Sequence, residues 1–553
     1  MRRSLLPISL VAVLAACPSS KPNKPTVAPP PPERVISAFR VADRMPAEVT
    51  YAGLARSLSV FVDGLRAALR PLRVLERSLT PDRIDAVLRR SLGWNPLDLG
   101  ELDDAGFDLD ASVGFFSVGV EPTALLPIKS KKRLEKFLAA RTTKLKVFIR
   151  RVKGRTHTSV ALDSSARLSW VVLDGYLAMH ISMRPAGVSS SDWKPTASWF
   201  DAIASKLPRG RSLSGSRALA WVLEGAGKRR DLAAYLDPPR FSKAAKAFGR
   251  AMPSSCEAHR AELSELPRVG AVALFKKARV DVALRAELGK SAAAALVKMT
   301  DGAPALPASI HDKAPLRLQI AFDANAIAQL SRRIGNRRCG PIFEVARELR
   351  YLPALFSAMP VLRYSAGRLA AALLKADERG QGTLHIEGAA LIAPASDADS
   401  KRIAATLTLT GKPETIANKQ VRVLSPSVNV AQTMRVFADA TRIALTSGEG
   451  LMQALLAAPL GGASKGPRTL LSFHATPSGV ADLRAPLKLV ENRRPSISRY
   501  SRISRYRRHY RYGRYAPLDA LGHLLSSYKQ LDIDVKVDPD RGELRAGLRY
   551  STR

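Results

Sequence analysis

The stretch LDIDVKVDPDRGELRAGL, residues 531–548, decides the fold class of this chain. From Leu531 to Val537 every second residue is apolar, and the residues between them are charged. The segment DPDRG at 538–542 then supplies the aspartate, proline and glycine that tight turns favour. A two-residue period around such a turn predicts two antiparallel strands with one solvent-exposed face.

Three further stretches predict pairs of strands joined by a turn. RLSWVVLDGYLAMHIS at 167–182 turns at Asp174-Gly175, and RVGAVALFKKARVDVALRAEL at 268–288 turns near Lys277. TLLSFHATPSGVADLRAPL at 469–487 turns at 477–479. ASVGFFSVGVEP at 111–122 predicts another strand.

Apolar residues at steps of three and four predict several helices. One long helix is expected over 50–79, and the next over 80–93, with Thr80 as its cap and Pro81 as its first residue. Further helices are expected over 129–140, 343–352 and 363–376. The six acids between Asp98 and Asp110 do not fit a calcium loop and are interpreted as turn and capping residues.

Strands in adjacent pairs, with helices that do not alternate with them, predict an α+β fold of antiparallel sheets with packed helices. A chain of 553 residues is too long for one ordinary core. We therefore expect two domains of similar size, 46–302 and 303–553. The similar endings RVDVALRAEL (279–288) and RGELRAGLRY (541–550) suggest related halves without establishing a repeat.

The charge balance is strongly basic. The 87 Lys and Arg residues exceed the 48 Asp and Glu residues by 39, and most of this excess is spread along the chain. Diffuse positive charge predicts attraction to anionic surfaces that weakens as salt is added.

The first seventeen residues, MRRSLLPISLVAVLAAC, show the order of a secretory signal: basic, then apolar, then small. Their last four residues, Leu-Ala-Ala-Cys, resemble the lipobox of bacterial lipoproteins. This resemblance implies that residues 1–16 are a signal peptide that is removed. It also implies that Cys17 carries the acyl chains that attach the protein to a membrane.

The segment PSSKPNKPTVAPPPPER, residues 18–34, contains seven prolines and almost no apolar residue. We expect 17–45 to be the lipidated cysteine and a disordered proline-rich linker, which extends about 50 Å at ~3.1 Å per residue. Pro18 follows the cysteine where the lipoprotein family places an aspartate for retention at the inner membrane. The resemblance therefore favours the outer membrane, with the body facing the periplasm or the surface.

Two further cysteines, Cys256 and Cys339, lie in the body of the chain. An exported protein meets an oxidising compartment, in which disulfides persist. We favour a disulfide between them over two buried thiols.

The run SRYSRISRYRRHYRYGRY, residues 498–515, has seven arginines, five tyrosines and no acid. We expect 493–515 to be a surface loop that binds an anionic component of the envelope, such as lipopolysaccharide, anionic lipid or peptidoglycan. Nucleic acid is not expected as a partner in that compartment. The candidate anion-binding residues are Arg499, Arg502, Arg505, Arg507, Arg508, Arg511 and Arg514.

No motif in the sequence assigns a catalytic residue, a metal site or a cofactor, so we expect none of the three. Ser191 and Lys194 have the S-x-x-K spacing, but they lack the companion motifs of the penicillin-binding family. We therefore expect a non-enzymatic envelope protein that binds or scaffolds. The alternatives are a carrier that holds an apolar ligand between sheet and helices, and an unrecognised periplasmic hydrolase.

Overall fold

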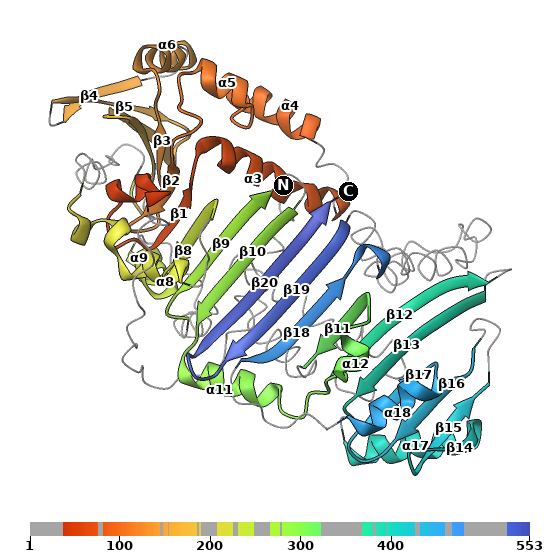
Figure 1. Cartoon of the computed structure of the whole chain (residues 1–553). Helices are drawn as coiled ribbons and strands as arrows, with labels where there is room; N and C mark the ends of the chain where they lie inside the picture. The colour runs from red at the N-terminus through yellow and green to blue at the C-terminus, as the bar shows by residue number, and fades with distance from the viewer. Residues whose placement is uncertain are drawn as a thin grey trace, which may run out of the picture. The chain divides into compact units, whose positions relative to one another are not determined.

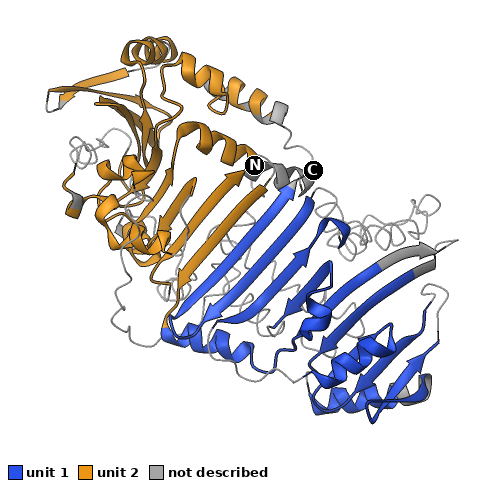
Figure 2. Cartoon of the chain, viewed as in Figure 1, with its two compact units in different colours: residues 1–17, 290–553 blue, residues 18–289 orange. Residues whose placement is uncertain are grey.

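The computed structural model describes residues 37–75, 81–143, 147–152, 154–184, 187–189, 207–224, 230–247, 266–276, 279–321, 368–379, 383–394, 396–425, 432–458, 467–479 and 528–552. They divide into two compact units, shown in Figure 2. Unit 2 has its described residues within 37–289, and unit 1 has them within 290–552. This boundary precedes the one expected from the sequence, at 302/303, and the division into two folding domains stays a prediction.

The strands of unit 2 form one antiparallel sheet. Its order is β4-β5-β6-β7-β3-β2-β1-β8-β9-β10. The strands are β1 (Tyr51–Ala55), β2 (Val113–Ser117), β3 (Thr123–Pro127), β4 (Val147–Val152), β5 (Arg155–Ala161), β6 (Ala166–Leu173), β7 (Tyr176–Met183), β8 (Leu232–Leu236), β9 (Val269–Lys276) and β10 (Arg279–Glu287). Figure 1 shows β4 and β5 at one end of this sheet.

The helices of unit 2 lie between its strands in the sequence. They are α3 (Leu58–Leu75), α4 (Pro81–Leu92), α5 (Leu99–Asp104), α6 (Lys131–Thr142), α8 (Arg217–Leu223) and α9 (Pro238–Ala247). Asp98 caps α5, because its side chain accepts hydrogen bonds from the backbone N–H groups of Gly100 and Glu101. The capping role expected for this acid is confirmed.

Both faces of the central strands of unit 2 are buried. On β6 and β7, Trp170 and Leu177 belong to one apolar cluster, while Val171 and Ala178 belong to another. Neighbouring residues on a strand point to opposite faces, so the two clusters lie on the two sides of the sheet. This explains why 167–182 is almost continuously apolar rather than alternating.

Unit 1 also forms an antiparallel sheet. Its order is β14-β15-β16-β17-β13-β12-β11-β18-β19-β20. The strands are β11 (Leu316–Ile320), β12 (Leu369–Arg379), β13 (Thr383–Ile392), β14 (Lys412–Ile416), β15 (Lys419–Leu424), β16 (Met434–Ala438), β17 (Ile443–Thr446), β18 (Arg468–Ala475), β19 (Tyr528–Asp538) and β20 (Glu543–Thr552). Its helices are α11 (Lys290–Met299), α12 (Ala308–His311), α17 (Asp397–Thr410) and α18 (Glu449–Ala457).

The two units share one strand topology. Adding ten to each strand number of unit 2 gives the order in unit 1, and every pairing in both orders is antiparallel. Two helices also keep their places: α6 and α17 follow the third strand of their units, and α8 and α18 follow the seventh. The two halves of the chain are therefore built on the same plan.

The hairpin at 531–548 is confirmed as β19 and β20. Asp538 pairs with Glu543, and Gly542 in the turn has φ +60°, which glycine adopts without strain. The hairpins at 167–182 and 268–288 are confirmed as β6–β7 and β9–β10, and the helices at 80–93 and 129–140 as α4 and α6. The prediction of an α+β fold with a large antiparallel sheet is thus confirmed.

The single helix expected over 50–79 is wrong in its first part. Residues 51–55 form β1, and α3 begins only at Leu58. The backbone of β1 bonds to β2 on one side and to β8 on the other, and Ala52 and Leu54 are buried. Pairing on both sides outweighs the helical spacing of these residues.

The helix expected over 363–376 is also wrong, because 369–379 form β12. This strand lies between β11 and β13, where Leu369, Ala370 and Ala372 are buried. Alanine and leucine favour a helix in isolation, but a central position in a sheet decides the outcome here. The helix expected over 343–352 lies outside the described residues.

The hairpin expected over 469–487 is wrong as well. β18 ends at Ala475, and its two edges are already paired with β11 and β19. Residues 477–479 are helical, and the Thr476 hydroxyl accepts a hydrogen bond from the N–H of Gly479 at 3.2 Å. Threonine followed by proline therefore starts a helical turn here.

Candidate ligand cleft

The site residues predicted from the sequence all lie outside the described residues. These are Cys17, Cys256, Cys339 and the seven arginines between Arg499 and Arg514. Ser191 and Lys194 lie outside them too. Lipidation, the disulfide and the basic loop accordingly stay predictions.

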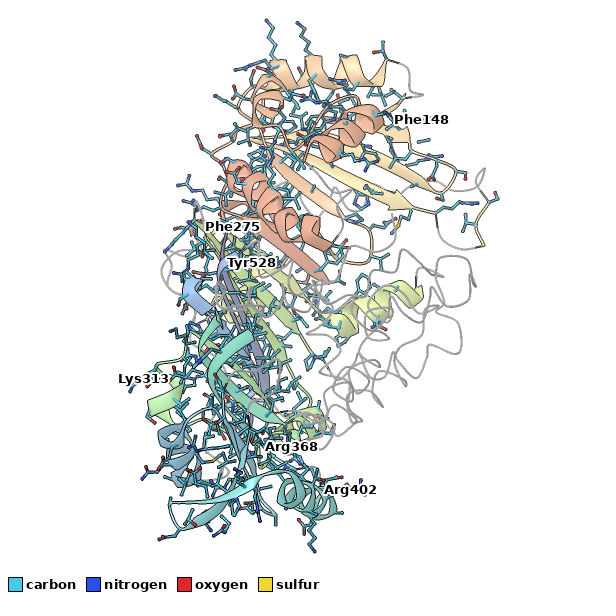
Figure 3. The ribbon with its side chains drawn as sticks, turned by 90° about the vertical axis from the view of Figure 1, so that its right-hand side faces the viewer. Phe148, Phe275, Lys313, Arg368, Arg402 and Tyr528 are labelled. Atoms are coloured by element: carbon cyan, nitrogen blue, oxygen red, sulfur yellow. The ribbon has the colours of Figure 1, made fainter. Side chains whose placement is uncertain are left out.

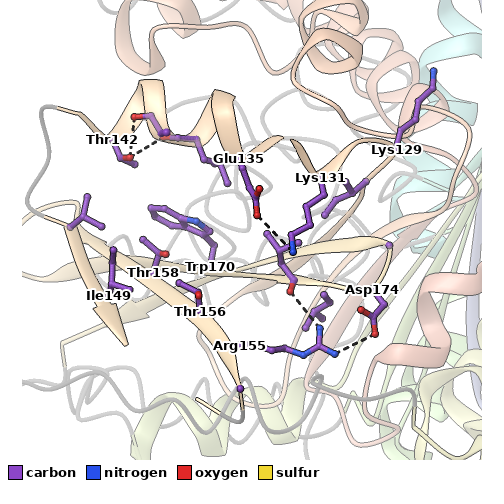
Figure 4. A pocket seen from close by; sticks show the side chains of 18 residues that line it. Lys129, Lys131, Glu135, Thr142, Ile149, Arg155, Thr156, Thr158, Trp170 and Asp174 are labelled. Atoms are coloured by element: carbon purple, nitrogen blue, oxygen red, sulfur yellow. Dashed lines mark hydrogen bonds and ion pairs between the residues drawn. The ribbon is translucent and has the colours of Figure 1, made fainter. Parts of the chain in front are cut away.

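The described residues form a cleft in unit 2, between α6 and one face of the sheet (Figure 4). It encloses about 700 Å³. One wall is the face of α6 that carries Lys131, Glu135, Leu138, Ala139 and Thr142. These residues recur at steps of three and four, so they share one side of the helix.

The floor of the cleft is made by alternate residues of β4, β5 and β6. Ile149 lies opposite Thr158, and Thr158 lies opposite Trp170 on the next strand. Residues directly opposite in antiparallel strands point to the same face, so these three side chains form one row across the floor. Val147 and Val172 also line the cleft, and Trp170 is only 8% exposed.

Local interactions hold α6 over this floor. The Ser130 hydroxyl accepts a hydrogen bond from the N–H of Arg133 at 3.4 Å and begins the helix. Leu134 is fully buried, and the Phe137 ring meets the Trp94 ring edge to face at 5.1 Å between centroids. These residues anchor the helix over the floor of the cleft.

Charged side chains gather at one end of the cleft. Arg155 Nη2 lies 3.3 Å from Asp174 Oδ2, and Lys131 Nζ lies 3.8 Å from Glu135 Oε1. Figure 4 shows Arg155, Asp174 and Lys131 at this end, Trp170 in the middle, and Ile149 with Thr142 at the other end. The cleft thus runs from a charged end to an end where an apolar residue, Ile149, lies near Thr142.

A second polar group lies within the same sheet. The hydroxyl of Thr123 is 2.8 Å from Nδ1 of His180, whose Nε2 is 3.5 Å from a carboxylate oxygen of Glu121. A hydroxyl, an imidazole and a carboxylate in this order are groups that a hydrolase uses. Thr123 is 3% exposed and His180 4%, however, so a substrate does not reach them. We assign this group to the packing of β3 against β7.

Within the part of the chain that the structure describes, no group of three or more His, Cys, Asp or Glu residues is placed to hold a metal ion. Among the described helices, none combines the length and the apolarity needed to cross a bilayer.

The cleft was not predicted from the sequence, although parts of its signal were visible. On the helix expected at 129–140, Leu134, Phe137 and Leu138 all pack in one core cluster, and Leu138 also lines the cleft. The β-branched residues of 147–160 and the glycine at 154 would have indicated the floor strands and their turn. Which strands lie under the helix depends on the sheet order, which local patterns do not contain.

No protein-family model matches the chain, and no curated protein matches it either. Two solved structures show a likeness: crystal form III of TP0453, with a TM-score of 0.24, and crystal form I of TP0453, with a TM-score of 0.22. Each is 10% identical and covers 45% of this chain, and the matches cover 79% and 78% of those chains. At these TM-scores the likeness carries no argument about fold or function.

Proposed function

We propose that this chain is a lipid-anchored protein of the cell envelope with a non-enzymatic binding role, and that its cleft holds the apolar chain of an amphiphile. The cleft between α6 and the β4–β6 face carries this proposal. A carrier that holds an apolar ligand between sheet and helix was one of the functions that the sequence left open. The leader sequence and its cysteine support the envelope and the anchor, with the outer membrane favoured.

The size of the cleft fits such a ligand, and its lining mixes apolar with polar side chains. Small-molecule sites usually enclose about 300–1,000 Å³ and combine apolar walls with a few polar groups that orient the ligand. Here Trp170, Val147 and Ile149 supply apolar surface, while Lys131 and Arg155 stand at one end. The apolar chain would lie over Trp170, and the polar head group would face the charged end.

A pair of substitutions on α6 tests the cleft without disturbing the core. Ala139 and Ala140 are both exposed, but Ala139 lines the cleft and Ala140 does not. We expect Ala139→Trp to fill the cleft and weaken the binding of a fluorescent fatty acid about tenfold or more, a loss of about 1.4 kcal/mol. Ala140→Trp should leave the affinity unchanged. Titration of the full chain that shows no saturable binding, or equal loss in both variants, would refute the cleft's role.

The basic segment 493–515 supports a second contact with the envelope, to lipopolysaccharide, anionic lipid or peptidoglycan. Deleting these residues should reduce retention on immobilised lipopolysaccharide or peptidoglycan at low salt, because arginine–phosphate and arginine–carboxylate attraction is screened by ions. Retention that is unchanged by the deletion and by salt would show that this segment is not the contact. The proline-rich tether and the division into two domains belong to the same proposal.

A further inference from the structure

A second basic segment lies in unit 2, far from 493–515 in the sequence. Residues 141–155 read RTTKLKVFIRRVKGR and contain seven lysines and arginines with no acid. In their middle stand three consecutive apolar residues, Val147, Phe148 and Ile149. Cations that flank an aromatic and β-branched core are the composition of a segment that meets an anionic interface.

The structure places the middle of this segment on β4, at the end of the sheet of unit 2. Among the described residues β4 pairs with β5 alone. Ile149 is 70% exposed and Phe148 is 42% exposed; Phe148 is labelled in Figure 3. Leu162, just after the end of β5, is 53% exposed. Large apolar side chains that are exposed together on one edge mark an interaction surface.

The cations lie beside these apolar side chains. Arg150 and Arg151 follow directly on β4 and are exposed. The Arg167 guanidinium stands over the Phe148 ring, 5.4 Å from its centroid. The nearest acids along the chain are Glu135 before this segment and Asp163 after it. Glu135 lies 3.8 Å from Lys131 Nζ, and the Asp163 carboxylate accepts hydrogen bonds from the backbone and hydroxyl of Ser165. The edge is therefore apolar and positively charged at once.

We propose that the β4 edge of unit 2, formed by Phe148, Ile149, Arg150 and Arg151, docks on the surface of an anionic phospholipid bilayer. Phe148 and Ile149 point to opposite faces of the strand, because neighbouring residues alternate. An added protein strand would cover the backbone of the edge and leave one or both side chains exposed. A bilayer interface accepts both side chains at once, since the strand enters it edge-on, while the arginines stay among the lipid phosphates.

This contact is separate from the attachment through Cys17 and from the segment 493–515, whereas Ile149 also lines the cleft and is shared with it. The test therefore uses the full chain carrying Cys17→Ser, so that no acyl chain contributes. The protein is floated with vesicles of phosphatidylcholine alone and with vesicles of phosphatidylcholine and phosphatidylglycerol in equal parts. We expect binding to the anionic vesicles that weakens as salt is added, and much weaker binding to the neutral vesicles.

Two variants and two matched controls locate the contact. Arg150→Glu/Arg151→Glu should reduce binding to anionic vesicles about tenfold or more, because each basic residue near such a surface contributes several-fold. Lys401→Glu/Arg402→Glu on α17 makes the same change of charge at exposed positions of unit 1 and should reduce binding much less. Phe148→Ser/Ile149→Ser should also weaken binding, whereas Phe241→Ser, which removes a phenylalanine that is 40% exposed, should not.

The fluorescence of a Phe148→Trp variant gives a second measurement. A blue shift upon addition of anionic vesicles is expected if this position enters the interface. Equal loss of binding in the β4 variants and the α17 control would overturn the proposal and indicate diffuse charge alone. Binding of both β4 variants that is as strong as that of the unaltered β4 edge would overturn it too. So would association of the protein with itself but not with vesicles.

Discussion

Arg150 and His157 lie directly opposite each other on β4 and β5, the guanidinium exposed and the imidazole buried. Burial lowers the pKa of His157 below its ordinary value of 6.5, and electrostatic interactions with Arg150 and His180 lower it further. At neutral pH, the imidazole of His157 is therefore uncharged in the folded protein. An unfolded chain binds the proton more readily, so acid favours unfolding at this position.

The first prediction follows from the downward shift of the His157 pKa. A depressed histidine pKa means that stability is lost as the pH falls through the unfolded value near 6.5. Urea unfolding should show a loss between about pH 8 and about pH 5, and His157→Gln should lose less than the wild type over that range. His311→Gln, at an exposed position, should follow the wild type. A pH dependence that is identical in wild type and His157→Gln would contradict the prediction.

The second prediction concerns Gly106, which positions the start of α6. Its φ is +92°, and a Cβ there would lie 2.6 Å from the backbone oxygen of Ser130. Its own carbonyl accepts hydrogen bonds from the N–H groups of Lys129 and Ser130. Gly106→Ala should cost about 3 kcal/mol, since a left-handed backbone and a backbone clash act together.

Gly119→Ala is the control for this substitution, because a Cβ there meets nothing within 4 Å. Calorimetry should show Gly106→Ala lowering one unfolding transition while a second stays in place, if the two units unfold as separate domains. A single transition that moves as a whole would speak against separate domains. An unchanged melting temperature would show that the turn relaxes.

The third prediction concerns Asp439, in the turn between β16 and β17. Burial would raise the pKa of this carboxyl, but hydrogen bonds from Thr441 and from the backbone of Arg442 outweigh it, and the pKa is lowered from 3.8. The stabilisation is therefore present above pH 3.8 and is lost as the pH falls through the lower, folded-state value. Asp439→Asn should cost about 1 kcal/mol at neutral pH, because it replaces charged hydrogen bonds by neutral ones.

This cost should shrink in acid, where the wild-type carboxyl is protonated as well. Stability is measured by urea unfolding from neutral pH down to about pH 3. Thr441→Val removes the hydroxyl that donates to Asp439 at 2.6 Å and should show a smaller loss with the same pH trend. A loss that is equal at every pH would mean that the charge of Asp439 is not responsible.

The fourth prediction concerns the anchor. If Cys17 is acylated as proposed, radiolabelled palmitate should enter the wild-type protein and not the Cys17→Ser variant, which lacks the thiol. The membrane fraction should lose most of the variant at high salt, where attraction between cations and lipid phosphates is screened. Membrane retention of Cys17→Ser at high salt, without label in the wild type, would refute lipidation.

Local pattern predicted three of the four expected hairpins and failed at two central strands, β1 and β12. Apolar and charged residues alternate from Leu531 to Val537, because one face of β19 is more polar than the other. This alternation predicted β19, β20 and the turn between them. Residues 51–55 and 369–373 pair with a strand on each side and bury neighbouring apolar residues, so alternation disappears. Their alanines and leucines then resemble a helix.

Local sequence pattern could not predict the cleft either. Leu138 and Trp170 belong to segments whose helical and strand character was predicted, yet their common cleft depends on which strand lies under which helix. The equivalence of the two units was suggested only by the endings at 279–288 and 541–550. It became visible when the strand orders could be compared, because topology is retained where sequence similarity is not.

The strand order of each unit constrains how the chain acquires its structure. The first strand, β1 or β11, lies in the interior of its sheet and must pair with residues that come much later, 232–236 for β1 and 471–475 for β11. A polypeptide that leaves a ribosome or a secretion channel with its amino end first cannot complete either sheet until those residues have emerged. Contacts so distant in sequence make folding slow. Each half therefore stays incompletely folded and prone to aggregation during synthesis. A chaperone that binds unfolded chains would act in that interval.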